Sequence, residues 1–186
     1  MRQFFAMATF FLALPAYADH PGDRLDAVMS EKEPAFEAVD IRDLPAMDLV
    51  GPEGASVGLT DLEDQVVILS FVPADCGAPC ADQQALLAKV RDGVNASPML
   101  SMVTFLVVSD AEEPVPQPLA ENVTIVRPKA TIEALIERFR ALATESPDAP
   151  LVHVFARGNR HAGIFAGDGF RQINMILYVN GLTNEH

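Results

Sequence analysis

The two cysteines of the chain, Cys76 and Cys80, stand four residues apart in the stretch FVPADCGAPCADQQALL. Residues i and i+4 are neighbours on one helix face, with Cα atoms near the roughly 6 Å that a disulfide prefers. The pair can therefore form a disulfide or direct both sulfurs at one metal ion. A helix N-terminus beside the pair would favour the thiolate form, because its partial positive charge lowers a thiol pKa. The spacing indicates a redox couple or a soft-metal clamp.

Other uses of the pair fit less well. A disulfide that closes so short a loop stabilises weakly, so a structural bridge in a non-catalytic binding domain is kept only as an alternative. A peroxide-reducing cysteine would need Thr or Ser three residues before it, and Gly77 holds that place before Cys80. Thiolates prefer Cu(I) or zinc, but zinc usually takes four protein ligands. With two cysteines and four histidines in the chain, copper is the better metal hypothesis.

The composition is that of an acidic globular protein. The chain has 186 residues, 49% of them apolar, which is enough for one domain with a core. Its formal net charge of −13 repels nucleic acid and anionic lipid headgroups, so neither is expected as a partner. Contact with a membrane is expected only through a partner protein or an uncleaved signal anchor.

The first 18 residues have the features of a secretory signal peptide. Arg2 precedes the apolar run Phe4–Leu14, and the small-residue triplet Ala16-Tyr17-Ala18 follows it. The apolar run is shorter than the roughly 20 residues that a membrane span needs. We therefore expect cleavage after Ala18 and export to a compartment where a cysteine pair can be oxidised. Residues 19–45 are polar and predict an extension before a domain over residues 46–186.

Buried strands alternate with helices along the predicted domain. Residues 65–72, QVVILSFV, are apolar and β-branched, as in a strand buried on both faces. Pro73 ends this strand, and a helical pattern follows that has Cys80 in its first turn and ends near Gly93. The other expected elements are short strands flanking a turn at 51–54, strands at 99–110 and 122–126, a helix at 131–146, a hairpin at 150–170 with its turn at Gly158-Asn159, and a helix at 170–182 ending at Gly181.

This alternation indicates an α/β fold with a central mixed sheet flanked by helices. A cysteine pair that follows the first long strand and enters a helix is typical of a thioredoxin-like domain. Reactive sites of open α/β sheets lie at the carboxyl ends of strands, and the cysteine pair falls at such an end.

Four stretches of the sequence resemble the SCO (SenC-type) family of periplasmic and mitochondrial copper chaperones. They are VVILSFVPADCGAPC, VTFLVVSDAEEP, VHVFARGNRHAGIF and INMILYVNGL, and the resemblance spans about Ala46 to Thr183. It implies a thioredoxin-like fold and copper held by Cys76 and Cys80. It also implies copper delivery to, or cysteine reduction of, the binuclear copper site of cytochrome c oxidase. The partner would be the copper-site subunit of that oxidase or another periplasmic thiol protein, in a Gram-negative bacterium.

The sequence departs from the family pattern at the third copper ligand. The family has a His before the first strand of the late hairpin, and Asp148 stands at the corresponding place. A carboxylate is a hard ligand and a poor one for Cu(I). His153 is the other candidate third ligand, although its alternation with Leu151 and Phe155 also fits a packed histidine within a strand. The departure favours an alternative function, a copper-independent thiol–disulfide oxidoreductase that has lost the third ligand.

Three further positions bear on the site. The Ala149-Pro150 pair resembles the cis-proline junction that faces the cysteines in thiol oxidoreductases, so Pro150 is expected beside the pair. Asp110 matches an Asp at the end of the family's second strand, although strand-end Asp residues also make turns. Of the remaining histidines, His161 follows the hairpin turn and is expected in solvent, while His20 could bind Cu(II) weakly through a free amino terminus.

Overall fold

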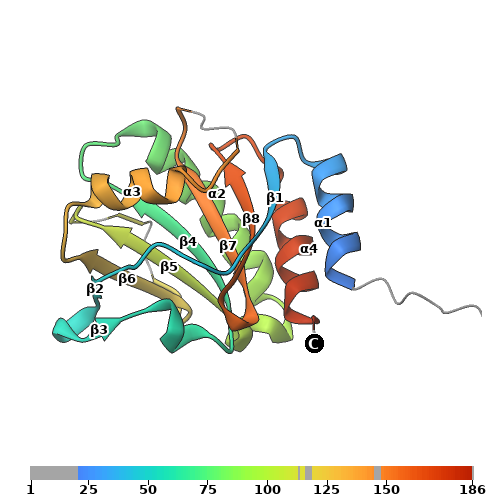
Figure 1. Ribbon diagram of the computed structural model, residues 1–186, viewed down its shortest axis with the longest axis horizontal. Helices are drawn as coiled ribbons and strands as arrows, with labels where there is room; N and C mark the ends of the chain where they lie inside the picture. The colour runs from blue at the N-terminus through green and yellow to red at the C-terminus, as the bar shows by residue number, and fades with distance from the viewer. Residues whose placement is uncertain (1–20, 113, 116–118, 145–147, 186) are drawn as a thin grey trace, which may run out of the picture.

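The computed structural model describes residues 21–112, 114–115, 119–144 and 148–185 (Figure 1). The predicted signal peptide at 1–18, His20 and the terminal His186 lie outside these residues. No helix within the described ranges combines the length and the apolar character that crossing a membrane requires.

The described strands form one mixed sheet in the order β1-β8-β7-β4-β5-β6-β2-β3. Strands β4, β5 and β6 are parallel to one another, and the remaining neighbours pair antiparallel. The predicted α/β fold with a central mixed sheet is confirmed. The strands are β1 (Phe36–Ile41), β2 (Leu49–Val50), β3 (Ser56–Val57), β4 (Val66–Val72), β5 (Val103–Ser109), β6 (Val123–Pro128), β7 (Leu151–Ala156) and β8 (Arg160–Ala166).

The central strands β4 and β5 are buried along their whole length, as their β-branched apolar sequences predict. Successive side chains of β4 enter opposite cores, with Ile68 on one face and Val67 and Leu69 on the other. Strand β5 begins at Val103 rather than at residue 99, because residues 98–102 form a 3-10 turn after Ser97. The Ser97 hydroxyl caps that turn by accepting from the backbone N–H of Met99 at 3.3 Å.

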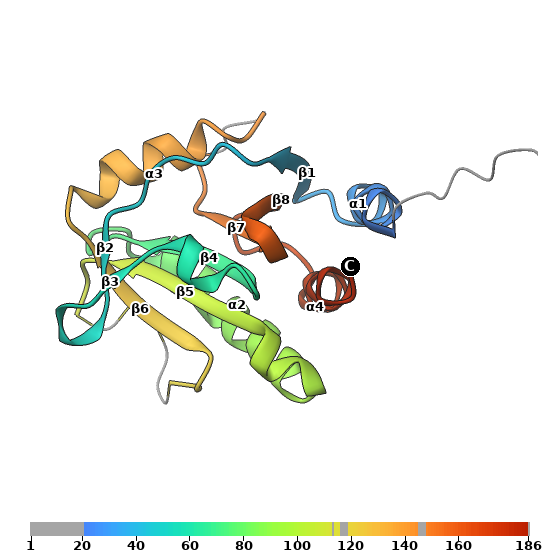
Figure 2. The ribbon, with the colours of Figure 1, turned by 60° about the horizontal axis from the view of Figure 1, so that its bottom comes forward.

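Helices cover both faces of the sheet. Helices α2 (Ala78–Asn95) and α4 (Gln172–Thr183) lie on one face, and α3 (Ile132–Arg140) lies alone on the other (Figure 2). We call these the helix-pair face and the α3 face. The helix-pair core includes Val66, Ile68, Leu87, Val90, Val94, Phe105, Val154, Phe165, Met175, Tyr178 and Val179. The α3 core includes Leu49, Val67, Leu69, Phe71, Leu106, Val108, Val126, Ile132, Leu135, Phe139 and Phe155.

Two glycines that the sequence places at helix ends lie inside the helices instead. A Cβ at Gly93 would lie 2.4 Å from the Ile176 side chain, so this glycine lets α2 approach α4 closely. A Cβ at Gly181 would lie 2.6 Å from the Leu25 side chain, which packs against α4. Both helices continue past these residues, to Asn95 and Thr183. The glycines therefore serve close helix packing and do not end the helices.

The described part of the predicted extension is folded against the sheet. Helix α1 (Pro21–Lys32) packs beside α4, and β1 pairs antiparallel with β8 at the sheet edge (Figure 1). The Tyr178 hydroxyl donates to Asp26 Oδ1 at 2.7 Å, and the buried Glu33 carboxylate accepts from the Arg171 N–H and from Asn174 Nδ2, both at 2.9 Å. Residues 21–41 therefore contribute a helix and an edge strand to the same sheet and core as the later elements.

Candidate functional site

The two cysteines lie where β4 leaves the sheet and α2 begins. They form a disulfide with a Cα–Cα separation of 5.8 Å. The loop before them turns through a hydrogen bond from the Cys76 N–H to the Pro73 carbonyl at 3.1 Å. Asp110, at the end of the neighbouring strand β5, accepts the Ala74 N–H at 2.8 Å and fixes this loop to the sheet. Asp110 is thus a loop anchor here.

The two sulfurs differ in access. Cys80 lies in the first turn of α2 and is 2% exposed, whereas Cys76 lies in the loop and is half-buried. Gly77 precedes the helix with φ +66°, a conformation that other residues rarely adopt, and Pro79 occupies the first helical turn. The Cys80 sulfur also lies 3.9 Å from the Phe71 carbonyl oxygen. Cys76 is therefore the sulfur that a partner can reach first.

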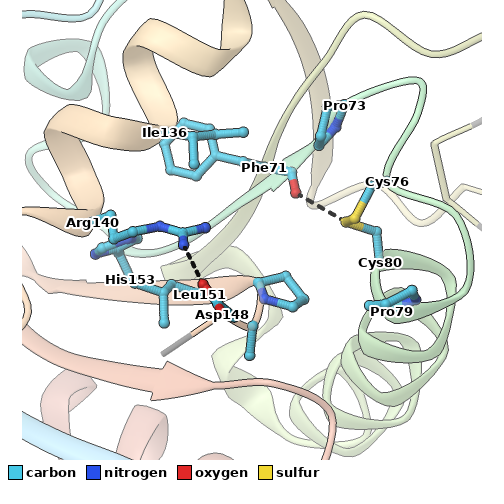
Figure 3. A pocket seen from close by; sticks show the side chains of 12 residues that line it. Phe71, Pro73, Cys76, Pro79, Cys80, Ile136, Arg140, Asp148, Leu151 and His153 are labelled. Carbon is cyan, nitrogen blue, oxygen red and sulfur yellow. Dashed lines mark hydrogen bonds and ion pairs between the residues drawn. A yellow bond between two sulfur atoms is a disulfide. The ribbon is translucent and has the colours of Figure 1, made fainter. Parts of the chain in front are cut away.

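A cavity of about 250 Å³ lies beside the disulfide (Figure 3). Both cysteines line it, together with residues from the end of β4, from α3 and from the segment that enters β7. Pro150, expected beside the pair, is in this wall. The walls are mainly apolar, formed by Phe71, Pro73, Pro79, Ile136, Pro150 and Leu151, with Arg140, Asp148 and His153 as the polar groups.

The candidate copper ligands do not gather around the sulfurs. Asp148 is exposed, and its carboxylate lies 3.9 Å from Nη1 of Arg140. In Figure 3, Asp148 turns toward Arg140, and His153 lies on the opposite side of the cavity from the cysteine sulfurs. Within the described ranges, no three His, Cys, Asp or Glu side chains are arranged to hold a metal ion. In this disulfide form, Asp148 and His153 line the same cavity as the cysteines without clustering around the sulfurs.

His153 is buried in β7 and pairs with a second histidine. Its Nδ1 lies 3.2 Å from Nε2 of His161, and its own Nε2 is buried without a hydrogen-bond partner in the described structure. The expectation that His161 is solvated is wrong: the residue is fully buried and its ring stacks on Phe155 at 4.8 Å. The hairpin turn occupies residues 157–159, so His161 already belongs to β8, where it faces the α3 core.

Burial sets the protonation of this histidine pair. It lowers the pKa of His161 to about 4. It also lowers the pKa of His153 well below its ordinary value, and repulsion from a protonated His161 lowers it further. Both imidazoles are therefore neutral near pH 7, and one of them donates its ring N–H to the other across the 3.2 Å contact.

Sequence reasoning missed Gln83, which connects the cysteine helix to the cavity wall. Its side chain is fully buried, and its Nε2 donates to the carbonyls of Pro150 at 2.8 Å and Gly167 at 2.9 Å. A signal was available, because Gln83 stands three residues after Cys80 on the same helix face, where a buried amide needs partners.

Searches with the sequence find no matching family model and no matching curated protein. The fold matches BsSco, a member of the Sco family of cytochrome c oxidase assembly proteins with an identified disulfide switch, at 13% identity and a TM-score of 0.63, covering 81% of this chain and 98% of that one. Copper-bound yeast Sco1 matches at 8% identity and a TM-score of 0.60, over 78% and 96% of the chains.

A structure from a second group is also similar. A putative thiol:disulfide interchange protein DsbE from Chlorobium tepidum matches at 19% identity and a TM-score of 0.53, covering 76% of this chain and all of that one. These likenesses show a thioredoxin-like fold of the SCO type, as the sequence resemblance predicted.

Proposed function

We propose that this chain is an exported SCO-like thiol protein that reduces the cysteines of, or delivers copper to, the binuclear copper site of cytochrome c oxidase. One observation carries the proposal. A cysteine pair, with one sulfur accessible and one buried, closes a disulfide beside a cavity at the carboxyl end of β4. The signal-like sequence at 1–18 supports export to the periplasm of a Gram-negative bacterium. Both the Sco and the DsbE-type neighbours support thiol chemistry on this fold.

The reduction begins with the dithiol form. The Cys76 thiolate attacks one sulfur of a client disulfide, a mixed disulfide forms, and the client's other sulfur leaves as a thiolate. The Cys80 thiolate then attacks the Cys76 sulfur, which forms the intramolecular disulfide and releases the second client thiolate. The client gains two electrons and, with two protons, becomes a dithiol, while this chain is oxidised. A periplasmic dithiol protein must then reduce the Cys76–Cys80 disulfide for another cycle.

The position of the pair suits this order of attack. Cys76 is the more accessible sulfur, and the amino end of α2 favours thiolates in the reduced state. A thiolate with a pKa near ambient pH is the best attacking group, because nucleophilicity falls as the pKa falls further.

Copper would be cargo of the same dithiol. Two thiolates are soft ligands that suit Cu(I), whereas Asp148 is a hard ligand, exposed and close to Arg140. This arrangement supports binding weaker than that of a three-ligand site. It also gives specific support to the second candidate function, a thiol–disulfide oxidoreductase that acts without copper.

Anaerobic Cu(I) titration of the reduced chain against a competing chelator tests the proposed copper delivery. We expect binding that is lost in the Cys76→Ser, Cys80→Ser double variant and strengthened in Asp148→His. Copper delivery is wrong if the double variant binds Cu(I) as tightly as the unaltered chain. Equilibration with glutathione tests the proposed cysteine reduction. We expect the Cys76–Cys80 disulfide to have a reduction potential above about −300 mV. A lower value indicates an inert structural bridge.

A further inference from the structure

We propose that Gln83 is a positioning residue for thiol–disulfide exchange, which holds the Pro150 segment of the cavity wall in place against the cysteine helix. This inference rests on the proposed function, since it concerns how a client polypeptide is presented to the Cys76–Cys80 pair. Gln83 does not contact the sulfurs in any described interaction, and it acts through the wall that faces them.

The Gln83 amide connects three elements. Nε2 uses both of its hydrogens, one toward the Pro150 carbonyl before β7 and one toward the Gly167 carbonyl after β8. The Gly167 N–H in turn donates to the Pro150 carbonyl at 2.9 Å. The open end of the β7–β8 hairpin is thereby fixed to α2, one turn beyond Cys80.

The orientation of the amide follows from these partners. Two carbonyl oxygens face the NH₂ group, while Oε1 is buried without a hydrogen-bond partner in the described structure. The opposite orientation would bring Oε1 against two acceptors, so the network fixes the amide as a double donor. Leu at this position offers no donor, and an ionised Glu offers only acceptors. The Gln83 amide supplies both donors, which neither of these replacements can do.

Loss of the Gln83 donors would affect thiol–disulfide exchange through the position of the Pro150 segment. Pro150 lines the cavity together with both cysteines, and it has no N–H of its own to hold it. Without the Gln83 donors, the Pro150 and Gly167 carbonyls each lose a buried partner, which favours displacement of the segment. A misplacement of about 1 Å in a group that positions a substrate can slow a reaction about 100-fold.

The neighbouring Gln84 provides a matched control. It is also buried in α2, but its Nε2 donates to the Ser70 hydroxyl of β4 at 3.0 Å, and Ser70 is not part of the cavity wall. A purely structural role would make the two glutamines equivalent in function, because each would contribute only to stability.

The test uses the full chain and its variants Gln83→Leu and Gln84→Leu. The rate at which each reduced protein reduces a disulfide-containing peptide is compared with its rate toward glutathione disulfide, at a temperature where all are folded. We expect the peptide-to-glutathione rate ratio to fall about 10-fold or more in Gln83→Leu. We expect the ratio to stay within about 2-fold of the original in Gln84→Leu, whatever stability that variant loses.

An unchanged ratio in folded Gln83→Leu overturns the inference. If that variant does not fold, Gln83→Glu replaces it: a carboxyl supplies at most one O–H donor in place of two N–H donors, so the ratio must fall there too. If the unaltered chain reduces neither disulfide, the thiol–disulfide exchange on which this inference rests is wrong, an outcome distinct from failure of the Gln83 role.

Discussion

The two faces of the sheet are both packed with aromatic side chains, but they handle buried polar groups differently. On the helix-pair face, Phe36, Phe165 and Tyr178 contact one another with ring centroids 4.7–6.0 Å apart, and the Tyr178 hydroxyl has Asp26 as partner. On the α3 face, rings of Phe71, Phe139 and His153 lie 5.2–6.1 Å apart.

The α3 face differs in its buried polar groups. His153 Nε2 is buried without a hydrogen-bond partner in the described structure, and the cavity beside the disulfide lies at this end. Residues 21–41 close the helix-pair face, with a buried carboxylate, Glu33, that has two donors. The comparison teaches that the ring cluster and the paired Glu33 carboxylate of the helix-pair face lie apart from the cavity, which opens on the α3 side beside the disulfide.

The largest expected effect comes from Phe165→Ala on the helix-pair face. Phe165 is fully buried among other rings, and its loss costs about 3–5 kcal/mol through lost burial and a cavity. Urea unfolding measures this loss of stability. We expect the folded variant to reduce a disulfide-containing peptide at the same rate as the unaltered chain. A large change in that rate would contradict the separation of the two faces.

The histidine pair makes the α3 face sensitive to acid. Both residues are neutral when folded, whereas in the unfolded chain they titrate near their ordinary pKa of about 6.5. Protons therefore bind the unfolded state first, and the free energy of unfolding falls as the pH drops from about 6.5 toward about 4. His161 alone accounts for about 3 kcal/mol of this loss.

Urea unfolding at several pH values tests this expectation. The His153→Gln, His161→Gln double variant removes both titrations and keeps hydrogen-bonding side chains. Its stability must depend less on pH between 4 and 6.5 than that of the unaltered chain. Equal slopes would show that the pair is not buried in a neutral state.

A smaller effect is expected from Gly163→Ala, again on the helix-pair face. The new Cβ would lie 2.3 Å from the Phe36 ring and 3.1 Å from the Tyr178 hydroxyl, which forces the core to shift. We expect a loss of about 1–3 kcal/mol by urea unfolding. Gly169→Ala is the control, because its Cβ would meet no atom within 4 Å.

The smallest effect is expected from Asp148→Asn. The carboxylate is exposed and 3.9 Å from Arg140, and exposed ion pairs contribute little. Stability should change by less than about 1 kcal/mol in urea unfolding. A loss of several kcal/mol would mean that Asp148 holds the cavity wall.

The sequence by itself determined the centre of the fold and the reactive pair. The β-branched apolar runs of β4 and β5 specify strands buried on both faces, and the cysteine spacing after β4 specifies a pair at a helix start. These are local patterns, in which each residue type reports its own burial or its near neighbours. The thioredoxin-like fold followed from them.

Only the tertiary structure decided the surroundings of the pair. Gln83 meets carbonyls 67 and 84 residues away, and His161 is buried because β8 pairs with β7 and places it against Phe155. Strand β1 was missed because its sequence, FEAVDI, does not alternate strictly between apolar and polar residues, and its place at the sheet edge depends on pairing with β8. Such contacts join distant parts of the chain, so no local pattern in the sequence records them.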